Sequence, residues 1–373
     1  MQVPEIRTSM KLSPSPLRSL VRLALPLAAA GGLLGASAGL TAPAQAAAVR
    51  PAAFTWHAFK LINGWQSASV PLLVTGTPAW ALHDGVIYLR GAVKNPASSV
   101  SEEFARLPVQ ARPARTLYLE DYSTAQAPGS VRIGSDGSVN AFGASSTQFT
   151  ALGNISFPLG SITPHKLALK NGWVSENSQY GTGDPAYSVS GGVVYLSGSM
   201  ASGKVGWAAV VLPKAARPAH VMYVLVYTYA GAAGLLTINP NGKVVATGSG
   251  AHGYTSLAGI SYPVASTKWH NFTLTASWKS ADSQYHTGSP AYVVINGVVY
   301  VGGGLTGTKA LDGLWTELPA AIQPSTQVFA EVDAGGTFGS VDFAQNYGIV
   351  NSSPVANSMK FTSLAALEYP PSA

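Results

Sequence analysis

The sequence predicts an all-β protein of three tandem antiparallel β-sandwich domains, of jelly-roll type, after a signal peptide. Two observations support this fold class. The same short motifs occur three times, with 105 to 108 residues between equivalent positions. Within each copy, short runs of alternating apolar residues are separated by turn residues every 8 to 12 residues or so, roughly the spacing of β-sandwiches. This period is longer than a solenoid repeat, so each copy is expected to form a small domain.

The N-terminal segment, residues 1–46, is predicted to be a secretory signal peptide. Arg18 and Arg22 precede an apolar stretch at 23–40, and Ala44-Gln45-Ala46 provides a small-x-small cleavage site. A membrane anchor is the alternative, but the stretch is weakly apolar and contains proline and several glycines. We therefore expect a secreted, extracellular protein, free or at the cell wall, with no membrane span after cleavage.

Charge and cysteine content exclude several classes of function. The 22 Lys and Arg and 16 Asp and Glu give a net charge of +6. Four of the basic residues and one acidic residue lie in the signal peptide, so the rest of the chain carries +3, without a basic cluster. This disfavours nucleic acid as a partner. The absence of cysteine excludes disulfides, thiol chemistry and cysteine-ligated metals, and no cofactor is expected.

Each repeat begins with an aromatic landmark and a hairpin. We place the repeats at residues 56–158, 164–263 and 268–370. A tryptophan near the start of each is assigned to the core or to packing between domains: Trp65, Trp173 and Trp278. The aromatic residue that follows Pro-Ala is assigned to the core: Trp80, Tyr187 and Tyr292. A β-branched hairpin follows, with a turn that tolerates positive φ: Asp84-Gly85, Gly191-Gly192 and Asn296-Gly297.

The second half of each repeat follows a Leu-Pro pair and ends on an aromatic-Pro pair. A second hairpin lies between them, turning at Asp136-Gly137 in repeat 1 and at 239–242 in repeat 2. We expect six to eight strands per repeat, and the sequence shows no convincing helical stretch. The joints at 158–164 and 263–268 are short and contain proline, so the repeats are expected to pack closely, as in a trimer.

One run of repeat 2 resembles a known family. Residues 185–198 read Pro-Ala-Tyr-x-Val-x-Gly-Gly-Val-Val-Tyr-Leu-x-Gly, followed by Leu212-Pro213, Arg217-Pro218 and the hairpin at 234–244. This is similar to the β-sandwich head and carrier domains of tailed-phage tail-fibre and baseplate receptor-binding proteins. The resemblance implies homotrimer-like packing and binding of cell-surface saccharides. The chain departs from that family in its signal peptide and three fused copies, and repeat 3 lacks both the Arg-Pro pair and the tight second hairpin.

Five aromatic residues are the candidate ligand-binding residues. Phe104, Trp207 and Trp315 lie in the variable stretch before Leu-Pro, and Tyr180 and Tyr285 lie in the motif Ser-Gln-Tyr-x-Thr-Gly. An exposed aromatic ring can stack on the apolar face of a sugar and offer a polar group at its edge. The alternative is that each ring packs onto its own domain.

Histidines and carboxylates are the candidate metal-binding and catalytic residues. His57, His165 and His270 recur eight residues before the tryptophan landmark, which allows a three-histidine metal site, but a packing role on a strand is favoured because metal-ligand spacing within a repeat is absent. The acidic pairs Glu102-Glu103 and Glu120-Asp121 have no counterpart in repeat 2. Glu331 and Asp333 do not restore a matching set in repeat 3.

These observations predict a secreted, non-enzymatic binding or adhesion protein that recognises a surface glycan or cell-wall polymer. A structural protein is the alternative, in which the three repeats form a covalent pseudo-trimer without a ligand. A polysaccharide hydrolase is a second alternative, and it needs two carboxylates that converge in a cleft.

Overall fold

Three successive stretches of the chain fold into the same set of strands. The structure is a computed structural model that describes residues 53–70, 73–97, 101–123, 128–143, 145–308, 313–344, 346–352 and 355–372. The predicted signal peptide, 1–46, lies outside the described residues. The chain from residue 50 onward forms one compact unit, and the strands of the three repeats fall within 56–158, 164–263 and 268–370.

The repeats contain these elements. Repeat 1 has β1 (His57–Ala58), β2 (Gln66–Ser67), β3 (Ala79–His83), β4 (Val86–Arg90), β5 (Ala92–Lys94), β6 (Glu103–Arg106), β7 (Leu117–Tyr122), β8 (Pro128–Ile133), β9 (Ser138–Phe142), β10 (Thr150–Ala151) and β11 (Ser156–Pro158). Repeat 2 has β12 (His165–Lys166), β13 (Val174–Ser175), β14 (Ala186–Ser190), β15 (Val193–Ser197), β16 (Ser199–Ala201), β17 (Ala208–Val211), β18 (Met222–Tyr227), β19 (Ala233–Ile238), β20 (Lys243–Thr247), β21 (Thr255–Ser256) and β22 (Ser261–Pro263). Repeat 3 has β23 (His270–Asn271), β24 (Trp278–Ser280), β25 (Ala291–Ile295), β26 (Val298–Gly302), β27 (Gly304–Gly307), β28 (Leu314–Glu317), β29 (Val328–Asp333), β30 (Phe338–Phe343), β31 (Tyr347–Ser352), β32 (Thr362–Ser363) and β33 (Leu367–Tyr369).

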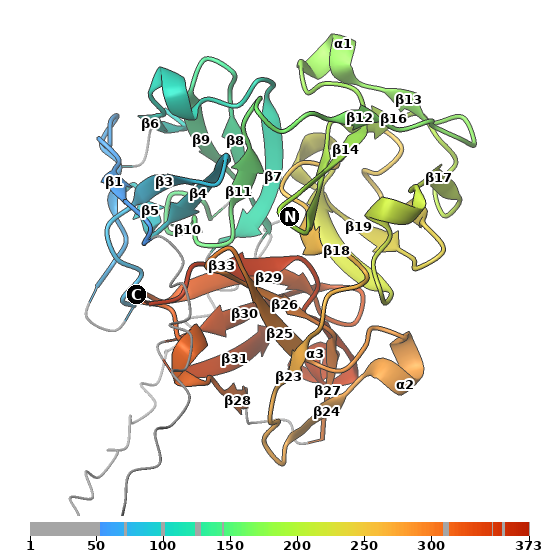
Figure 1. Cartoon of the computed structure of the whole chain (residues 1–373). Coiled ribbons are helices and arrows are strands. Elements are labelled where there is room, and N and C mark those ends of the chain that lie inside the picture. Colours follow the sequence, from blue (N-terminus) through green and yellow to red (C-terminus); the bar gives the residue numbers. More distant parts are fainter. Residues whose placement is uncertain are drawn as a thin grey trace, which may run out of the picture. The chain divides into compact units, whose positions relative to one another are not determined.

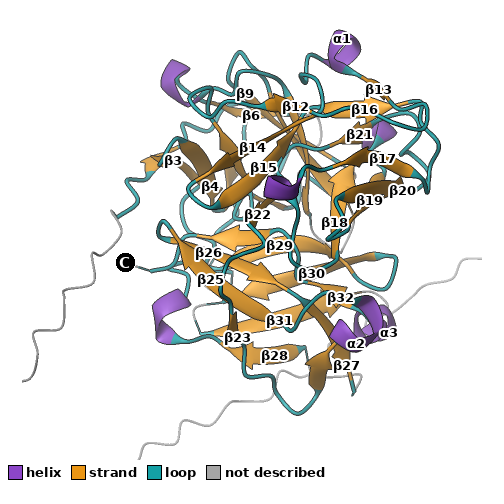
Figure 2. Cartoon of the chain, turned by 45° about the vertical axis from the view of Figure 1, so that its right-hand side comes forward, coloured by secondary structure: helices purple, strands orange, loops and turns teal. Residues whose placement is uncertain are grey.

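Helices are short and connect the strands. The α-helices are α1 (Asn177–Tyr180), α2 (Asp282–Tyr285) and α3 (Val355–Lys360). Single 3-10 turns are η1 (Val109–Ala111), η3 (Lys214–Ala216), η4 (Tyr229–Gly231) and η5 (Ala320–Ile322). Figure 2 shows how little helix interrupts the strands. The structure confirms the all-β prediction, with more strands per repeat than the six to eight expected because several contain two residues.

The sheets of the three repeats have one topology (Figure 1). In repeat 1 the orders are β1-β3-β4-β11, β10-β5-β2 and β6-β9-β8-β7, and the equivalent strands of repeats 2 and 3 follow the same orders. Every strand pairing in the described residues is antiparallel, for example Trp80 with Leu89 and Tyr187 with Leu196. The described sheets therefore fit three tandem sandwich domains.

The first hairpin turns as predicted in all three repeats. His83 pairs with Val86, leaving Asp84-Gly85 as a two-residue loop. Both loop residues have positive φ, 48° and 78°. The corresponding loops Gly191-Gly192 and Asn296-Gly297 have φ values of 57° and 85°, and 51° and 77°. Asp, Asn and Gly tolerate this left-handed conformation, which matches the twist of the strands.

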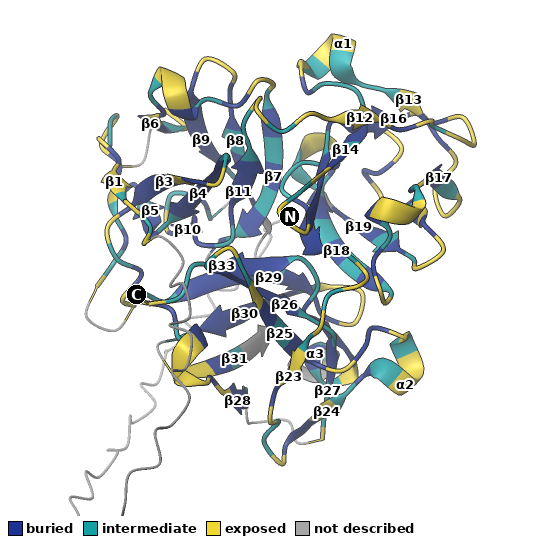
Figure 3. Cartoon of the chain, in the orientation of Figure 1, coloured by how far each residue is buried: buried dark blue, intermediate teal, exposed yellow. Residues whose placement is uncertain are grey.

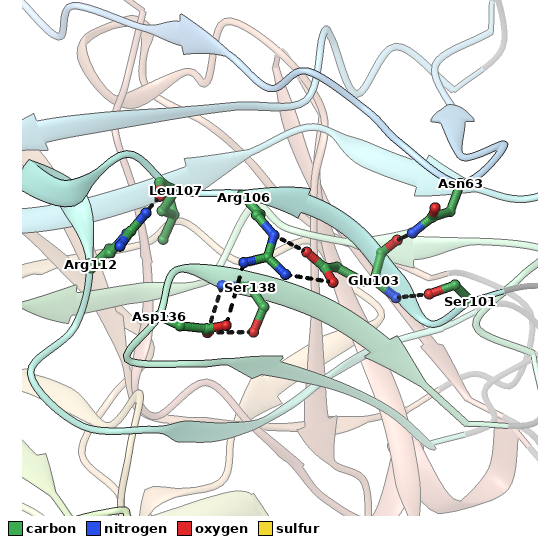
Figure 4. Close-up of polar contacts among 8 residues, drawn as sticks. All are labelled: Asn63, Ser101, Glu103, Arg106, Leu107, Arg112, Asp136 and Ser138. Atoms are coloured by element: carbon green, nitrogen blue, oxygen red, sulfur yellow. Dashed lines mark hydrogen bonds and ion pairs between the residues drawn. The ribbon is translucent and has the colours of Figure 1, made fainter.

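The recurring Leu-Pro-x-x-x-Arg-Pro motif is explained by one hydrogen bond. Arg112 Nε donates to the carbonyl oxygen of Leu107 at 3.1 Å, as Figure 4 shows. Arg217 Nε makes the same bond to Leu212 at 3.0 Å. In repeat 3, Gln323 Nε2 donates to Leu318 at 3.1 Å, so this repeat keeps the contact although it lacks the Arg-Pro pair.

A β-bulge in the strand before Leu-Pro determines which aromatic residues are buried. In β6, Glu103 pairs with Asn140 and Ala105 with Val139, which leaves Phe104 as the extra residue. β17 and β28 contain the same shift, at Ala209 and Trp315. A bulge redirects side chains, and here it turns the extra residue into the core, where Phe104 and Trp315 are both 0% exposed.

Each repeat has its own apolar core, and a further cluster is shared. The landmark residues Trp65, Trp173 and Trp278 are buried as predicted. Figure 3 shows burial along the strands and exposure on the loops and short helices. The shared cluster, called the central core below, takes residues from all three repeats: Val86, Tyr88, Val193, Tyr195, Val293, Val298 and Tyr300.

Equivalent backbone contacts close the repeats into a ring. Thr116 N donates to Gly181 O of repeat 2 at 3.1 Å. Val221 N of repeat 2 donates to His286 O of repeat 3 at 2.9 Å, and Gln327 N of repeat 3 donates to Val74 O of repeat 1 at 2.8 Å. Each repeat thus donates at the same position to the next, and β7, β18 and β29 pack against one another (Figure 1). This is a pseudo-threefold arrangement within one chain.

A buried polar group differs between the repeats at this centre. Ser156, Ser261 and Glu368 occupy equivalent positions on β11, β22 and β33. Both serine hydroxyls donate to the Glu368 carboxylate, Ser261 at 2.6 Å, and Asn154 Oδ1 accepts from Glu368 N at 2.9 Å. Three identical glutamates could not satisfy one another in this way, so the repeats are not interchangeable.

Among the described residues, no helix is long and apolar enough to cross a membrane.

Candidate binding site between the repeats

Two pockets lie at equivalent junctions of the ring. The first, called the Trp269 pocket, has a volume of about 290 Å³ and lies between repeats 2 and 3. The second, called the Arg115 pocket, has a volume of about 340 Å³ and lies between repeats 1 and 2. Both are lined by the aromatic-Pro pair that closes one repeat and by the short helix of the next. Small-ligand sites are of this size or larger and are favoured at such interfaces.

The Trp269 pocket offers an aromatic surface. Trp269 immediately precedes β23, is half-buried, and lies against Gly302, where an added Cβ would be 3.2 Å from the ring. Repeat 1 has an equivalent tryptophan, Trp56, but the guanidinium of Arg90 lies 4.3 Å from the centre of its ring. Gly302 takes the place of that arginine in repeat 3, so no arginine lies on the Trp269 ring, which is among the residues that line the pocket.

Polar groups surround this aromatic surface. His220, Asn271 and Ser289 line the pocket and are exposed. Asp282, the first residue of α2, also lines it, and its Oδ1 accepts from Gly288 N at 2.7 Å, which fixes the loop beside the pocket. An apolar ring with hydroxyl, amide, imidazole and carboxylate groups around it is suited to a polyhydroxylated ligand.

The Arg115 pocket has the same place in the fold but different chemistry. Lys166 Nζ lies 2.8 Å from Asp184 Oδ2, and Ser175 Oγ donates to Asp184 Oδ1 at 2.7 Å. Both hydrogen bonds lower the pKa of Asp184 below its usual value, and the one from Lys166 has the larger effect. Arg115 is exposed at the rim. This pocket therefore has a cationic rim. It lacks the aromatic surface of the Trp269 pocket, because Pro164 takes the position that Trp269 has in repeat 3.

Two of the five predicted binding residues are fully buried. Phe104 and Trp315 are fully buried at the bulge described above, so the expectation that they are exposed loop aromatics is wrong. Trp207 precedes β17, outside the bulge, and is 53% exposed. Lys204 Nζ lies 3.9 Å from the centre of its ring, so one face of Trp207 is already covered by a cation.

Tyr180 and Tyr285 lie at the junctions, next to the pockets. Tyr180 ends α1 and contacts Tyr254 at 4.7 Å between ring centres, with Tyr118 of repeat 1 at 6.0 Å. Tyr285 ends α2 and stacks on Phe361 at 4.1 Å. Both are half-buried. Neither tyrosine is among the residues that line the Trp269 pocket or the Arg115 pocket, and their role in binding stays a prediction.

The recurring histidines pack on aromatic rings, as favoured from the sequence. His57 stacks on Trp80 at 4.5 Å between ring centres, and His165 and His270 lie 5.3 and 5.5 Å from Tyr187 and Tyr292. No group of three metal-ligating side chains is found within the described part of the chain.

Carboxylates do converge, but across repeats. Glu120 and Asp121 of β7 and Glu331 of β29 line one cavity of about 50 Å³ at the centre of the ring. Burial raises the pKa of both glutamates well above their usual value, and the neighbouring Asp121 adds to this for Glu120. A search for converging carboxylates within one repeat misses this cluster, because Glu120 and Glu331 belong to different repeats.

Trp269 was also missed by the sequence reasoning. It stands immediately before the recurring histidine, at a position that is Trp56 in repeat 1 and Pro164 in repeat 2. That disagreement between copies was the available signal. No protein-family model, curated protein or solved structure matches the chain.

Proposed function

We propose that this protein is a secreted, non-enzymatic binding protein that holds a surface glycan or cell-wall polymer in the Trp269 pocket. One observation carries the proposal, namely that the Trp269 ring and exposed polar side chains together line a cavity of about 290 Å³. The ring of repeats supports a likeness to the homotrimeric head domains of phage receptor-binding proteins, with one chain in place of three.

Retention on a panel of glycans and isolated cell-wall polysaccharides tests this proposal. Trp269→Ala is expected to weaken binding at least about tenfold, equivalent to about 1.4 kcal/mol. Trp56→Ala is the matched control, because this ring is covered by Arg90, and it should leave binding unchanged. Absence of retention of the wild-type protein on every polymer would contradict the binding function. Loss with Trp207→Ala alone would move the site to Trp207.

A structural role without a ligand is the second candidate. It is favoured by the closed ring, in which the central core and the Glu368 network bury groups from every repeat. Small-angle scattering that showed extended, separated repeats would reject it. The hydrolase alternative gains less support, because the carboxylates surround a cavity with room for a few water molecules rather than a sugar ring.

A further inference from the structure

We propose that the junction between repeats 1 and 3 is a proton-controlled closure, held shut when Glu120 and Glu331 carry protons and loosened when they ionise. The other two junctions are each spanned by the peptide chain, at 158–164 and 263–268. Repeats 1 and 3 meet through non-covalent contacts of the ring. This inference is independent of what the pockets bind.

The two glutamates face this junction from equivalent positions. Glu120, Leu225 and Glu331 are the fourth residues of β7, β18 and β29, the three strands that pack together at the centre of the ring. Glu120 and Glu331 line the same cavity of about 50 Å³, with Leu225 as the third member. Carboxyl groups therefore meet where repeat 1 faces repeat 3, and repeat 2 contributes an apolar side chain.

The two glutamates have no partner among the described residues that would stabilise a negative charge. Both oxygens of Glu120 and Oε2 of Glu331 are buried and accept no hydrogen bond from these residues; Oδ2 of Asp121 accepts none either, although the Asp121 carboxylate has a hydrogen bond with the backbone of Tyr122. The described residues that line this cavity include no lysine, arginine or histidine. An ionised carboxylate in such surroundings is costly, and two of them also repel each other.

The surrounding ionisable groups include one cation, and the others act in the same direction or stay neutral. On the packed strands and their neighbours these groups are Tyr118, Asp121, Tyr122, Arg132, Tyr223, Tyr227, Asp333, Asp342 and Glu368. The cation, Arg132 of β8, pairs with Tyr118 and places its guanidinium 6.0 Å from the centre of the Phe142 ring. Burial raises the pKa of Asp333 and Asp342 to about 6, so both add negative charge as the pH rises. Glu368 accepts hydrogen bonds from two serines, and burial raises the pKa of Tyr122, Tyr223 and Tyr227 above the ordinary tyrosine value.

The direction of the pH effect follows from these shifts. The folded pKa of each glutamate lies above its unfolded value of 4.5. The protonated, closed junction is therefore fully stable below about pH 4.5, and it loses stability as the pH rises through the folded pKa values. The aromatic stack of Tyr122 on Phe329, with ring centres 5.3 Å apart, is among the contacts that opening would separate.

Distance measurements can report opening directly, because the chain has no cysteine and can be labelled in pairs. Val109, Lys214 and Ala320 are exposed and begin the equivalent turns η1, η3 and η5. Spin labels at Val109→Cys and Ala320→Cys span the proposed closure, and labels at Val109→Cys and Lys214→Cys span a peptide-linked junction. Between pH 5 and pH 8, we expect the first distance distribution to broaden and the second to stay unchanged.

The variant E120Q/E331Q should keep the first distribution narrow at pH 8, because neutral amides remove the repulsion. Thermal unfolding should agree, with a fall in wild-type Tm of at least about 5 °C from pH 5 to pH 8 that the double variant reduces. Glu317→Gln, at an exposed glutamate of repeat 3, is the control and should behave as wild type. Unchanged distances in the wild-type pair, or the same pH dependence in the double variant, would overturn the proposal. So would closure at pH 8 by calcium ions, which would indicate a cation site.

Discussion

At the scale of single residues, the position five residues after the leucine of Leu-Pro shows how different side chains can make the same structural contact. The carbonyl oxygen of the leucine, which precedes a 3-10 turn, accepts from arginine in two repeats and from glutamine in the third. Gly242 approaches the same oxygen so closely that an added Cβ would be 2.5 Å away. The motif is therefore a structural device of the fold rather than a binding signature.

Arg217→Ala is expected to lower the free energy of unfolding by about 1.5 to 3 kcal/mol, because a charge-assisted bond to a half-buried carbonyl is lost. Arg217→Gln should cost less than about 1 kcal/mol, since Gln323 makes the equivalent bond in repeat 3. Urea denaturation measures both values. Lys214→Ala, at an exposed position of the same turn, is the control and should be neutral. Equal losses for the alanine and glutamine variants would contradict this role.

The candidate residues could be predicted from the sequence only in part. Trp65, Trp173 and Trp278 were assigned to the core or to packing between domains because they recur in a fixed frame, and they are buried. Phe104 and Trp315 looked like exposed loop residues because sequence does not reveal a one-residue bulge. Strict alternation places successive residues of a strand on opposite faces of the sheet. The bulge instead places two successive residues of the strand inside the core.

At the scale of elements, the first hairpins were predictable, but their meeting point was not. Their three turns come together around a cavity lined by Asp84, Gly191 and Asn296. His83 Nε2 lies 2.8 Å from Asn296 O, and Asn296 Nδ2 donates weakly to Gly191 O at 3.5 Å. The sequence predicts each turn by its own φ requirements. The packing of one turn on another depends on residues more than 100 positions apart.

Gly191→Asn tests this contact. In an isolated turn the change would be neutral or stabilising, because asparagine tolerates the φ of 57° found there. In the protein, an added Cβ would lie 2.4 Å from Asn296 Nδ2, so the exposed Asn296 side chain must turn aside and give up its contact with Gly191 O, and we expect a loss of about 0.5 kcal/mol. Asn296→Gly should relieve it, with a coupling energy of about 0.5 kcal/mol in a double-mutant cycle followed by thermal unfolding. Additive effects would show that the turns do not interact.

At the scale of the whole molecule, the repeats have diverged where they meet. The strands and turns of each repeat follow the same pattern, whereas the residues at the centre of the ring differ between repeats. One layer at the centre contains Ser156, Ser261 and Glu368, and another contains Glu120, Leu225 and Glu331. Fusion of three copies permits this asymmetry, which a homotrimer cannot have. The repeat count and fold class follow from sequence alone. The ring depends on contacts between repeats, and no pattern within one repeat encodes them.

The shared central core predicts that one repeat alone does not fold stably. A fragment of residues 164–263 would expose Val193 and Tyr195, which are 1% and 6% exposed in the whole chain. Each such side chain contributes roughly 1.5 to 3 kcal/mol when buried, a large part of the stability of a small domain. We therefore expect the fragment to lack a cooperative thermal transition by circular dichroism. As the control, the whole chain cut by a protease at a site inserted at 159–164 should keep its two pieces associated on size-exclusion chromatography at pH 5, where the ring is closed. A cooperative transition in the isolated fragment would show that each repeat is an autonomous domain and that the ring adds no stability that its folding requires.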